Sequence, residues 1–137
     1  MNYWILKSEP DVYSYDDLVK QKIGTWDGVR NYTARNNLKE MKKGDLAFFY
    51  HSNIGKEIVG IIKIEEEAFQ DPSSEDGRWV AVKVSPVEKL KHTVTLKDLK
   101  ADPKMQHIEL VRLSRLSVMT LKKEDFDYIL DVAESKK

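Results

Sequence analysis

Aromatic, arginine and asparagine side chains gather between Trp26 and Asn37 more densely than elsewhere in the chain. Trp26 and Tyr32 offer flat faces on which a nucleobase stacks. Arg30 and Arg35 offer planar forks that fit phosphates or base edges, and asparagine amides pair a donor with an acceptor. These residue types suit recognition of a base, although a capped helix entry with a buried Trp26 explains the same residues.

A second polar cluster, Lys7-Ser8-Glu9-Pro10, follows an aromatic and β-branched run that predicts a strand. At a strand end, Ser8 and Glu9 can hydrogen-bond a ligand while Lys7 supplies a cation. A lysine beside a glutamate can also perform general acid–base chemistry if desolvation shifts their pKa values. The alternative is a strand exit with a proline and a surface ion pair, and the spacing alone favours it.

A third cluster, Phe49-Tyr50-His51-Ser52, lies at the end of another predicted strand. Strand alternation places Phe48 and Tyr50 on one face and Phe49 and His51 on the other. Tyr50, His51 and Ser52 then either rim a pocket or end a core strand with a hydrogen-bonded histidine.

Most enzymatic signatures are absent from the 137 residues. The chain has no cysteine, its three histidines lack metal-ligand spacing, and it has no phosphate-binding or nucleophile-elbow motif. We therefore expect no cofactor and no metal. No apolar run approaches membrane-spanning length and the start lacks a basic signal region, so we expect no membrane partner and a cytoplasmic setting.

The formal net charge is zero, but the charges are unevenly placed. Residues 83–123 carry 10 basic and 4 acidic side chains, and acidic stretches lie on both sides of them. The zero sum excludes a generally basic nucleic-acid coat protein, not a local basic surface. Arg112, Arg115, Lys122 and Lys123, with the lysines from 83 to 104, are the candidate phosphate-facing residues.

The elements that must position these clusters alternate short strands with capped helices. Ser14 with Asp17 predicts one helix start and Asn31 another, on which Ala34, Leu38 and Met41 form the core stripe. A loop is expected over 26–30. Strands are expected at 2–7, 46–51, 57–66, 79–85 and after 113, and helices at 14–23, 31–42, from Thr95 to 99 and from about 120. The strands are not interleaved with long crossover helices, which predicts an α+β fold whose mainly antiparallel sheet curls into a small barrel.

Together these clusters, in this order, resemble the EVE domain. The resemblance spans nearly the whole chain, and its Trp-Asp-Gly-Val-Arg-Asn and Phe-Tyr-His-Ser runs are specific. The matching stretches are Tyr3-Trp4, Lys7-Ser8-Glu9-Pro10, Trp26 to Tyr32, Ala34-Arg35-Asn36, Gly44-Asp45, Phe49 to Asn53, Ile58-Val59-Gly60, Asp71-Pro72, Arg78-Trp79 and Leu113 to Val118.

The resemblance implies a single domain over residues 1–137 with a curled β-barrel like that of pseudouridine-synthase-and-archaeosine-transglycosylase (PUA) domains, and helices packed around it. It also implies an aromatic-lined pocket that reads a modified base. Arg30 and Arg35 would be the nearest phosphate or base-edge contacts. The implied pocket residues are Lys7, Ser8, Glu9, Trp26, Val29, Asn31, Tyr32, Tyr50, His51 and Ser52.

Two classes of function follow. The first is a non-catalytic binding module for a modified, flipped-out base in DNA or RNA, for which stacking offsets the unpairing cost. The second is an amidohydrolase-like enzyme on a modified nucleoside, with Lys7 and Glu9 as its acid–base pair. A small-metabolite sensor is a weaker third option. The zero charge and the absent catalytic motifs favour the binding module.

Overall fold

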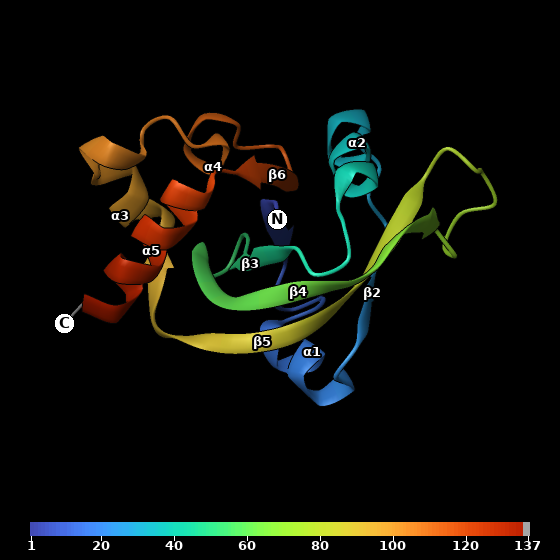
Figure 1. Cartoon of the computed structure of the whole chain (residues 1–137), viewed down its shortest axis with the longest axis horizontal. Coiled ribbons are helices and arrows are strands. Elements are labelled where there is room, and N and C mark those ends of the chain that lie inside the picture. Colours follow the sequence, from blue (N-terminus) through green and yellow to red (C-terminus); the bar gives the residue numbers. More distant parts are fainter. Residues whose placement is uncertain (136–137) are drawn as a thin grey trace.

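The structure is a computed structural model that describes residues 1–135 (Figure 1). Six strands, five α-helices and one 3₁₀ turn make up this described part. In chain order they are β1 (Tyr3–Ser8), α1 (Tyr15–Gln21), β2 (Gly24–Trp26), α2 (Tyr32–Glu40), β3 (Leu46–His51), β4 (Glu57–Gln70), β5 (Val80–Thr95), α3 (Leu96–Ala101), η1 (Pro103–Met105), α4 (Glu109–Arg112), β6 (Val118–Leu121) and α5 (Lys123–Ser135).

All six strands form one sheet in the order β2-β5-β4-β3-β1-β6. Only β1 and β3 are parallel, which confirms a mainly antiparallel sheet in an α+β fold. The long strands β4 and β5 curve together through the molecule, as Figure 1 shows. Within the described residues β2 and β6 are the two edges and do not pair with each other, so closure into a barrel is not confirmed.

Local capping signals set the helix starts where the sequence predicts them. Ser14 Oγ accepts a hydrogen bond from the Asp17 amide at 3.1 Å, and the Asp17 carboxylate accepts one from the Ser14 amide at 2.9 Å. Asn31 Oδ1 caps α2 by accepting from the Ala34 amide at 2.9 Å. The expected stripe on α2 is buried, with Ala34 and Leu38 on the helix itself.

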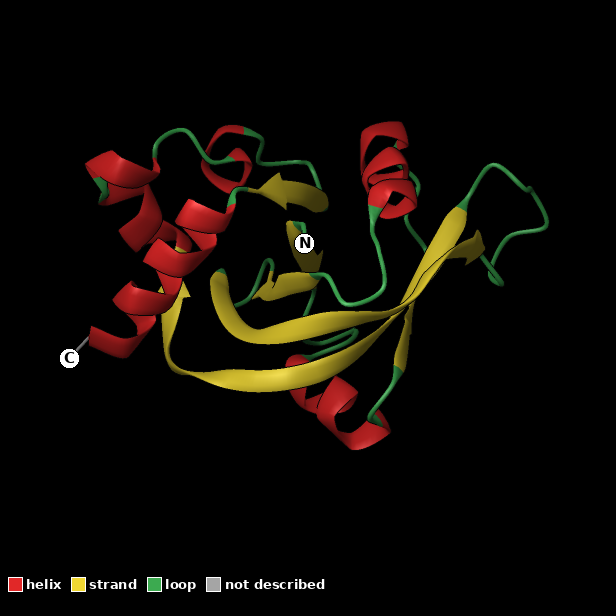
Figure 2. Cartoon of the chain, viewed as in Figure 1, coloured by secondary structure: helices red, strands yellow, loops and turns green. Residues whose placement is uncertain are grey.

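Strand β3 is buried on both faces, which explains its continuous apolar run. The ring of Phe48 stacks against Phe126 of α5, with centroids 4.3 Å apart. On the opposite face Phe49 contacts Trp26 and His51 edge-on, at 5.2 Å and 5.5 Å between centroids. The predicted alternation along this strand is confirmed. Figure 2 shows α1 and α2 on opposite sides of the β4–β5 ribbon, whose connecting loop projects at one end of the molecule.

Three expected boundaries before residue 100 were wrong, and in each case pairing with a distant segment decides the outcome. Trp26 belongs to β2, because it pairs with Val82 of β5. The strands predicted at 57–66 and 79–85 extend further, because β4 and β5 pair with each other despite their polar outer residues.

The chain after residue 113 also differs from expectation. The short helix α4 occupies residues just before it, and the strand expected after residue 113 begins only at Val118. Thr120 lies in β6 opposite Trp4 instead of opening the last helix, which starts at Lys123. The amide and hydroxyl of Thr120 both donate to the Glu109 carboxylate, at 2.8 and 2.7 Å. No helix in the described chain is long and apolar enough to cross a membrane.

Candidate functional site

A cavity of about 440 Å³ opens where the end of β1 faces the segment that joins β2 to α2. It brings together five predicted site residues, Lys7, Ser8, Trp26, Val29 and Arg30. The other lining residues are Val12, Tyr13, Thr25, Asp27, Gly28 and Ser117. Its size is within the range of small-ligand pockets.

Aromatic rings form one wall of this cavity. Trp26 is buried against Phe49, and Tyr13 meets the Trp26 ring edge-on with centroids 6.2 Å apart. Trp26 therefore packs in the core and lines the cavity at once. Tyr13 was not among the predicted site residues, because only the folded chain brings the loop after β1 over β2.

The polar end of the cavity is built on Lys7 and Ser8. Lys7 Nζ donates to the carbonyl oxygen of Ser114 at 2.9 Å and lies 5.7 Å from the centroid of the Tyr50 ring. Burial lowers the pKa of Lys7 from its usual range. Ser8 Oγ donates to the Tyr13 carbonyl at 2.6 Å, which leaves its lone pairs for a second donor.

A buried carboxylate fixes the wall opposite β1. Asp71 accepts hydrogen bonds from the Gly28 amide at 2.8 Å, from Arg30 Nη1 at 2.9 Å and from the Ser73 amide and hydroxyl at 2.7 and 2.6 Å. Burial opposes ionisation, but the hydrogen bonds from Ser73, Arg30 and Gly28 prevail and lower the pKa of Asp71 to about 2. Gly28 has φ +76°, a conformation that favours glycine.

Tyr32 and Arg35 lie outside the cavity in a second group of side chains. The Tyr32 ring stacks on Trp79, with centroids 5.2 Å apart and planes inclined by 30°. The Arg35 guanidinium lies 5.0 Å from the Tyr32 centroid, and Arg78 Nη1 donates to the Tyr32 hydroxyl at 3.2 Å. We call Tyr32, Arg35, Arg78 and Trp79 the platform. Arg30 joins it to the cavity, because its guanidinium lies 5.5 Å from the Trp79 ring.

The remaining predicted residues do not line the cavity. His51 Nε2 accepts from the Tyr15 amide at 3.1 Å, and burial lowers the pKa of this histidine, so it holds the first turn of α1. Tyr50 is buried beneath Lys7. The Glu9 carboxylate is exposed and accepts from Asn53 at 2.5 Å.

Two further predicted residues bond to backbone groups of neighbouring segments. Asn31 serves as the α2 cap. The Ser52 amide donates to the Ser8 carbonyl at 2.9 Å, which ties the end of β3 to the end of β1.

The basic residues of 83–123 do not converge on one surface. Arg115 lines a separate hollow beside Asn31, and Arg112 lines another beside His107. Lys83 and Lys89 are ion-paired with Glu66 and Asp16. Across residues 1–135, no group of three histidine, cysteine or carboxylate side chains is placed to hold a metal ion.

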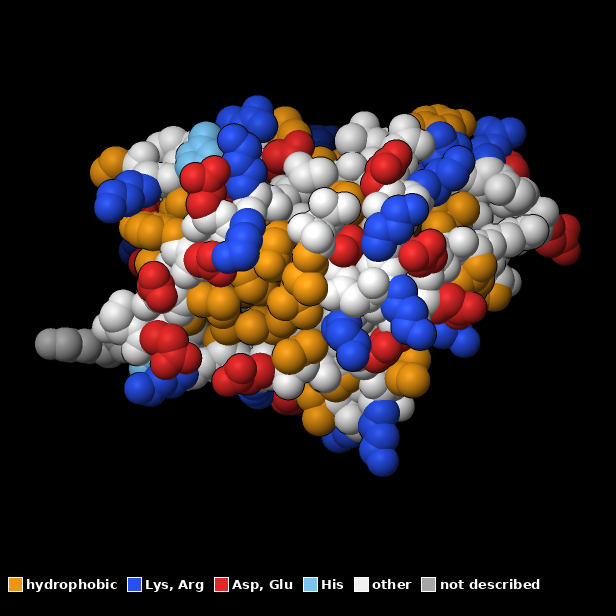
Figure 3. All heavy atoms as spheres, viewed as in Figure 1, with side chains coloured by type: hydrophobic (Ala, Val, Ile, Leu, Met, Phe, Trp, Pro, Cys, Tyr) orange, Lys and Arg blue, Asp and Glu red, His pale blue; other side chains and the backbone are white. Residues whose placement is uncertain are grey.

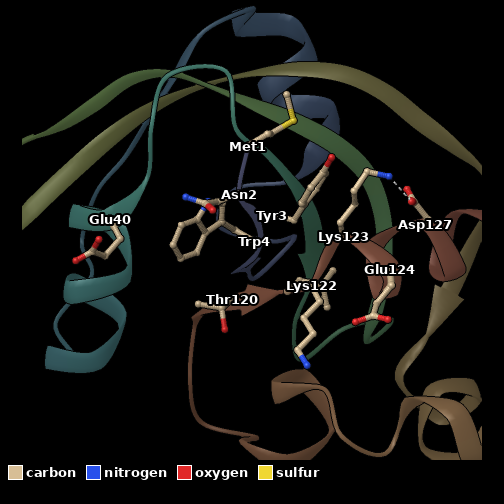
Figure 4. Close-up of a pocket in the computed structure, with 11 residues that line it drawn as sticks. Met1, Asn2, Tyr3, Trp4, Glu40, Thr120, Lys122, Lys123, Glu124 and Asp127 are labelled. Carbon is tan, nitrogen blue, oxygen red and sulfur yellow. Dashed lines mark hydrogen bonds and ion pairs between the residues drawn. The ribbon is translucent and has the colours of Figure 1, made fainter.

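A larger hollow of about 740 Å³ lies at the other end of β1 and contains none of the predicted pocket residues, although the candidate phosphate-facing Lys122 and Lys123 line it. Figure 4 shows Tyr3 and Trp4 along it, Glu40 of α2 on one side and the Lys123–Asp127 ion pair of α5 on the other. Figure 3 shows hydrophobic side chains gathered on the face of the molecule where the N-terminus lies, with charged side chains around them. The larger hollow also combines aromatic side chains with lysines, but the smaller cavity is lined by five of the residues predicted to contact a base.

A family model described as the EVE domain matches residues 2–132. The chain belongs to the EVE domain family. Thymocyte nuclear protein 1 of Mus musculus is 38% identical to this EVE domain chain, over 98% of the chain and 75% of the relative.

Two solved structures place the fold among known ones. The human THYN1 protein, in a structure described as a complex with DNA containing 5-methylcytosine, superposes with a TM-score of 0.93 at 34% identity and covers 100% of both chains. The YTH domain of Zygosaccharomyces rouxii MRB1 superposes with a TM-score of 0.58 at 15% identity, over 99% of this chain and 88% of the YTH chain, a likeness of fold alone. The fold of this chain is thus shared with a human protein whose structure is described as a complex with DNA.

Proposed function

We propose that this EVE domain, acting as one unit over residues 1–137, is a non-catalytic module that recognises a modified base in nucleic acid, with DNA as its first partner. The base would leave the stack and enter the cavity between Lys7 and Trp26. The observation that carries the proposal is an aromatic-walled, cation-bearing cavity in a chain whose human relative was solved with 5-methylcytosine-containing DNA.

The cavity offers each kind of contact that a base needs. Trp26 and Tyr13 provide aromatic surface, and base–aromatic stacking is worth about 1–3 kcal/mol. Lys7 provides a donor for a base carbonyl or ring nitrogen, and Asp27 provides an acceptor for an exocyclic amine. Val29 provides an apolar contact for a methyl group.

The amidohydrolase alternative finds less support. Its proposed acid–base pair was Lys7 with Glu9, but Glu9 is absent from the residues that line the cavity and its carboxylate contacts Asn53. A base of suitable pKa would have to come from elsewhere. Binding is therefore the function that we propose.

The test is a titration of fluorescent oligonucleotides by anisotropy. Strands and duplexes would carry one cytosine, 5-methylcytosine or another modified base at a fixed position, with RNA of the same sequence alongside, at about 50 and about 200 mM salt. We expect a preference for one modified base, because one added methyl group in an apolar pocket is worth about 1–3 kcal/mol, or roughly 10- to 200-fold. Equal binding of every base at low salt, or no binding, would refute the proposal.

Lys7→Met removes the cation of the cavity and should weaken binding of the preferred base. Lys97→Met is the matched control, because Lys97 is exposed on α3, away from the cavity in the fold. The same loss of affinity in both variants would mean that bulk charge, and not the cavity, holds the ligand.

A further inference from the structure

The platform exposes aromatic surface for which the fold has no evident need. Tyr32 is 54% exposed, although its ring stacks on Trp79. The buried face of α2 is already anchored by Ala34 and Leu38 on the other side of the helix. An exposed ring flanked by guanidinium groups offers stacking and cation–π contacts to a base from a strand.

Positive charge on the platform is available to a ligand. Arg35 donates to Asn36 Oδ1 at 2.8 and 3.2 Å and to the Arg78 carbonyl at 3.2 Å, and within the described chain it contacts no carboxylate. Arg78 pairs with Asp76, but both side chains are about half exposed, and surface pairs of this kind contribute little. A phosphate can therefore displace Asp76. The Arg30 charge is less available to a ligand than that of Arg78, because its partner Asp71 is buried.

The platform also lies in the path of a strand that uses the cavity. Arg30 lines the cavity and lies against Trp79, and Asp71 holds both Arg30 and Gly28 in place. The nucleotide next to one whose base occupies the cavity would therefore pass Arg30 and meet Trp79 and the Tyr32 ring stacked on it. The cavity and the platform would thus contact two neighbouring nucleotides of one strand.

We propose that the platform is a second, sequence-independent binding surface, where a nucleic-acid strand places its phosphates against Arg35 and Arg78 and one unstacked base against Tyr32. The inference deepens the proposed function and rests on it for the orientation of the strand. The platform supplies affinity for any strand, whereas the cavity supplies the preference for a modified base.

The salt dependence of binding to an unmodified single-stranded DNA tests the platform directly. Each phosphate contact with a single strand contributes about 0.7 to the slope of log K against log salt. Arg35→Gln combined with Arg78→Gln should therefore lower the slope by about 1.4 and weaken binding about 25-fold at about 0.1 M salt. Arg35→Lys combined with Arg78→Lys keeps both charges and should keep the slope.

Two control variants separate the platform from bulk charge and from misfolding. Lys97→Gln combined with Lys100→Gln removes two exposed charges from α3 and should leave the slope unchanged. Tyr32→Ala should weaken binding by about 5- to 150-fold, the range for one lost base stack, while Tyr32→Phe retains binding. Thermal unfolding of each variant would show that the fold is retained.

The outcomes distinguish this inference from the proposed function. An unchanged slope in the double arginine-to-glutamine variant, or the same decrease in the α3 variant, overturns the platform even if the protein still prefers a modified base. Normal slopes and platform effects without any preference for a modified base overturn the proposed function and leave the platform standing. Failure of the protein to bind any strand at low salt overturns both.

Discussion

Asp71→Asn tests whether one buried carboxylate holds the wall of the cavity. The substitution keeps the shape of the side chain but replaces the carboxylate with a neutral amide. That carboxylate accepts hydrogen bonds from Gly28, Arg30 and Ser73. The pKa of Asp71 is lowered from 3.8 to about 2. At about 1.36 kcal/mol per pKa unit, the ionised form stabilises the fold by about 2.5 kcal/mol at neutral pH. We expect Asp71→Asn to lower the free energy of unfolding by about this amount.

The pH dependence of that difference identifies its cause. Because the folded-state pKa of Asp71 is depressed, its stabilisation is fully present above the unfolded-state pKa and is lost as the pH falls toward about 2. The gap between wild type and variant should narrow from about 2.5 kcal/mol near pH 7 to about 1.3 kcal/mol near pH 3. Urea unfolding at the two pH values measures it.

Asp76→Asn is the matched control, because Asp76 lies in the same loop and pairs with an arginine, but its side chain is 47% exposed. It should change stability far less than Asp71→Asn does. A gap for Asp71→Asn that stays constant between the two pH values would refute the electrostatic reasoning. The Asp71→Asn variant should also bind the preferred oligonucleotide more weakly, because the segment that carries Gly28 and Arg30 loses its anchor.

Three further predictions concern the packing around α1. Gly60→Ala should destabilise the fold by about 1–3 kcal/mol or more, because a Cβ there would overlap the Tyr15 ring, and thermal unfolding measures the loss. Partial burial lowers the pKa of His51, so the unfolded state takes up a proton near pH 6.5 that the folded state resists, and wild type loses stability as the pH falls. His51→Gln should therefore flatten the decrease in melting temperature between about pH 7.5 and about pH 5.5. Tyr15→Phe should cost about 1 kcal/mol at neutral pH by removing the 2.9 Å hydrogen bond to the Ile61 carbonyl. Burial raises the Tyr15 pKa from 10.0 to about 12, so wild type loses stability as the pH rises through that interval and Tyr15→Phe lacks this step.

Local sequence signals were sufficient for the elements whose ends depend on neighbouring residues. Ser14 with Asp17 and Asn31 with Ala34 are caps that form within one turn, so the sequence shows them directly. The alternation along 46–51 likewise follows from strand geometry. Lys7 and Ser8 reach the cavity at the end of the predicted strand β1, whereas Trp26 reaches it through the pairing of β2 with β5.

Long-range contacts set the features that the sequence did not reveal. Asp71 meets Gly28 across 43 residues, and Arg78 meets Tyr32 across 46. Neither pair has a local signature, because the β4–β5 loop reaches the start of α2 only once the sheet is built. The Asp71-Pro72 turn and the Arg78-Trp79 pair were visible as motifs, but nothing in their spacing connected them to residues 26–35.

The distribution of basic residues over the surface determines how the zero net charge affects nucleic-acid binding. Several residues of the basic third quarter of the chain line separate hollows, and three of its lysines form exposed surface ion pairs, Lys83–Glu66, Lys89–Asp16 and Lys123–Asp127. Because these basic residues are dispersed, a strand bound at the platform should contact few of them, and few phosphate contacts mean a shallow salt dependence. Weak general affinity leaves discrimination to the cavity, since only a base that fits against Trp26 adds stacking energy beyond what every strand obtains. We therefore expect the ratio of affinities for modified and unmodified strands to remain nearly constant with salt while both affinities decrease.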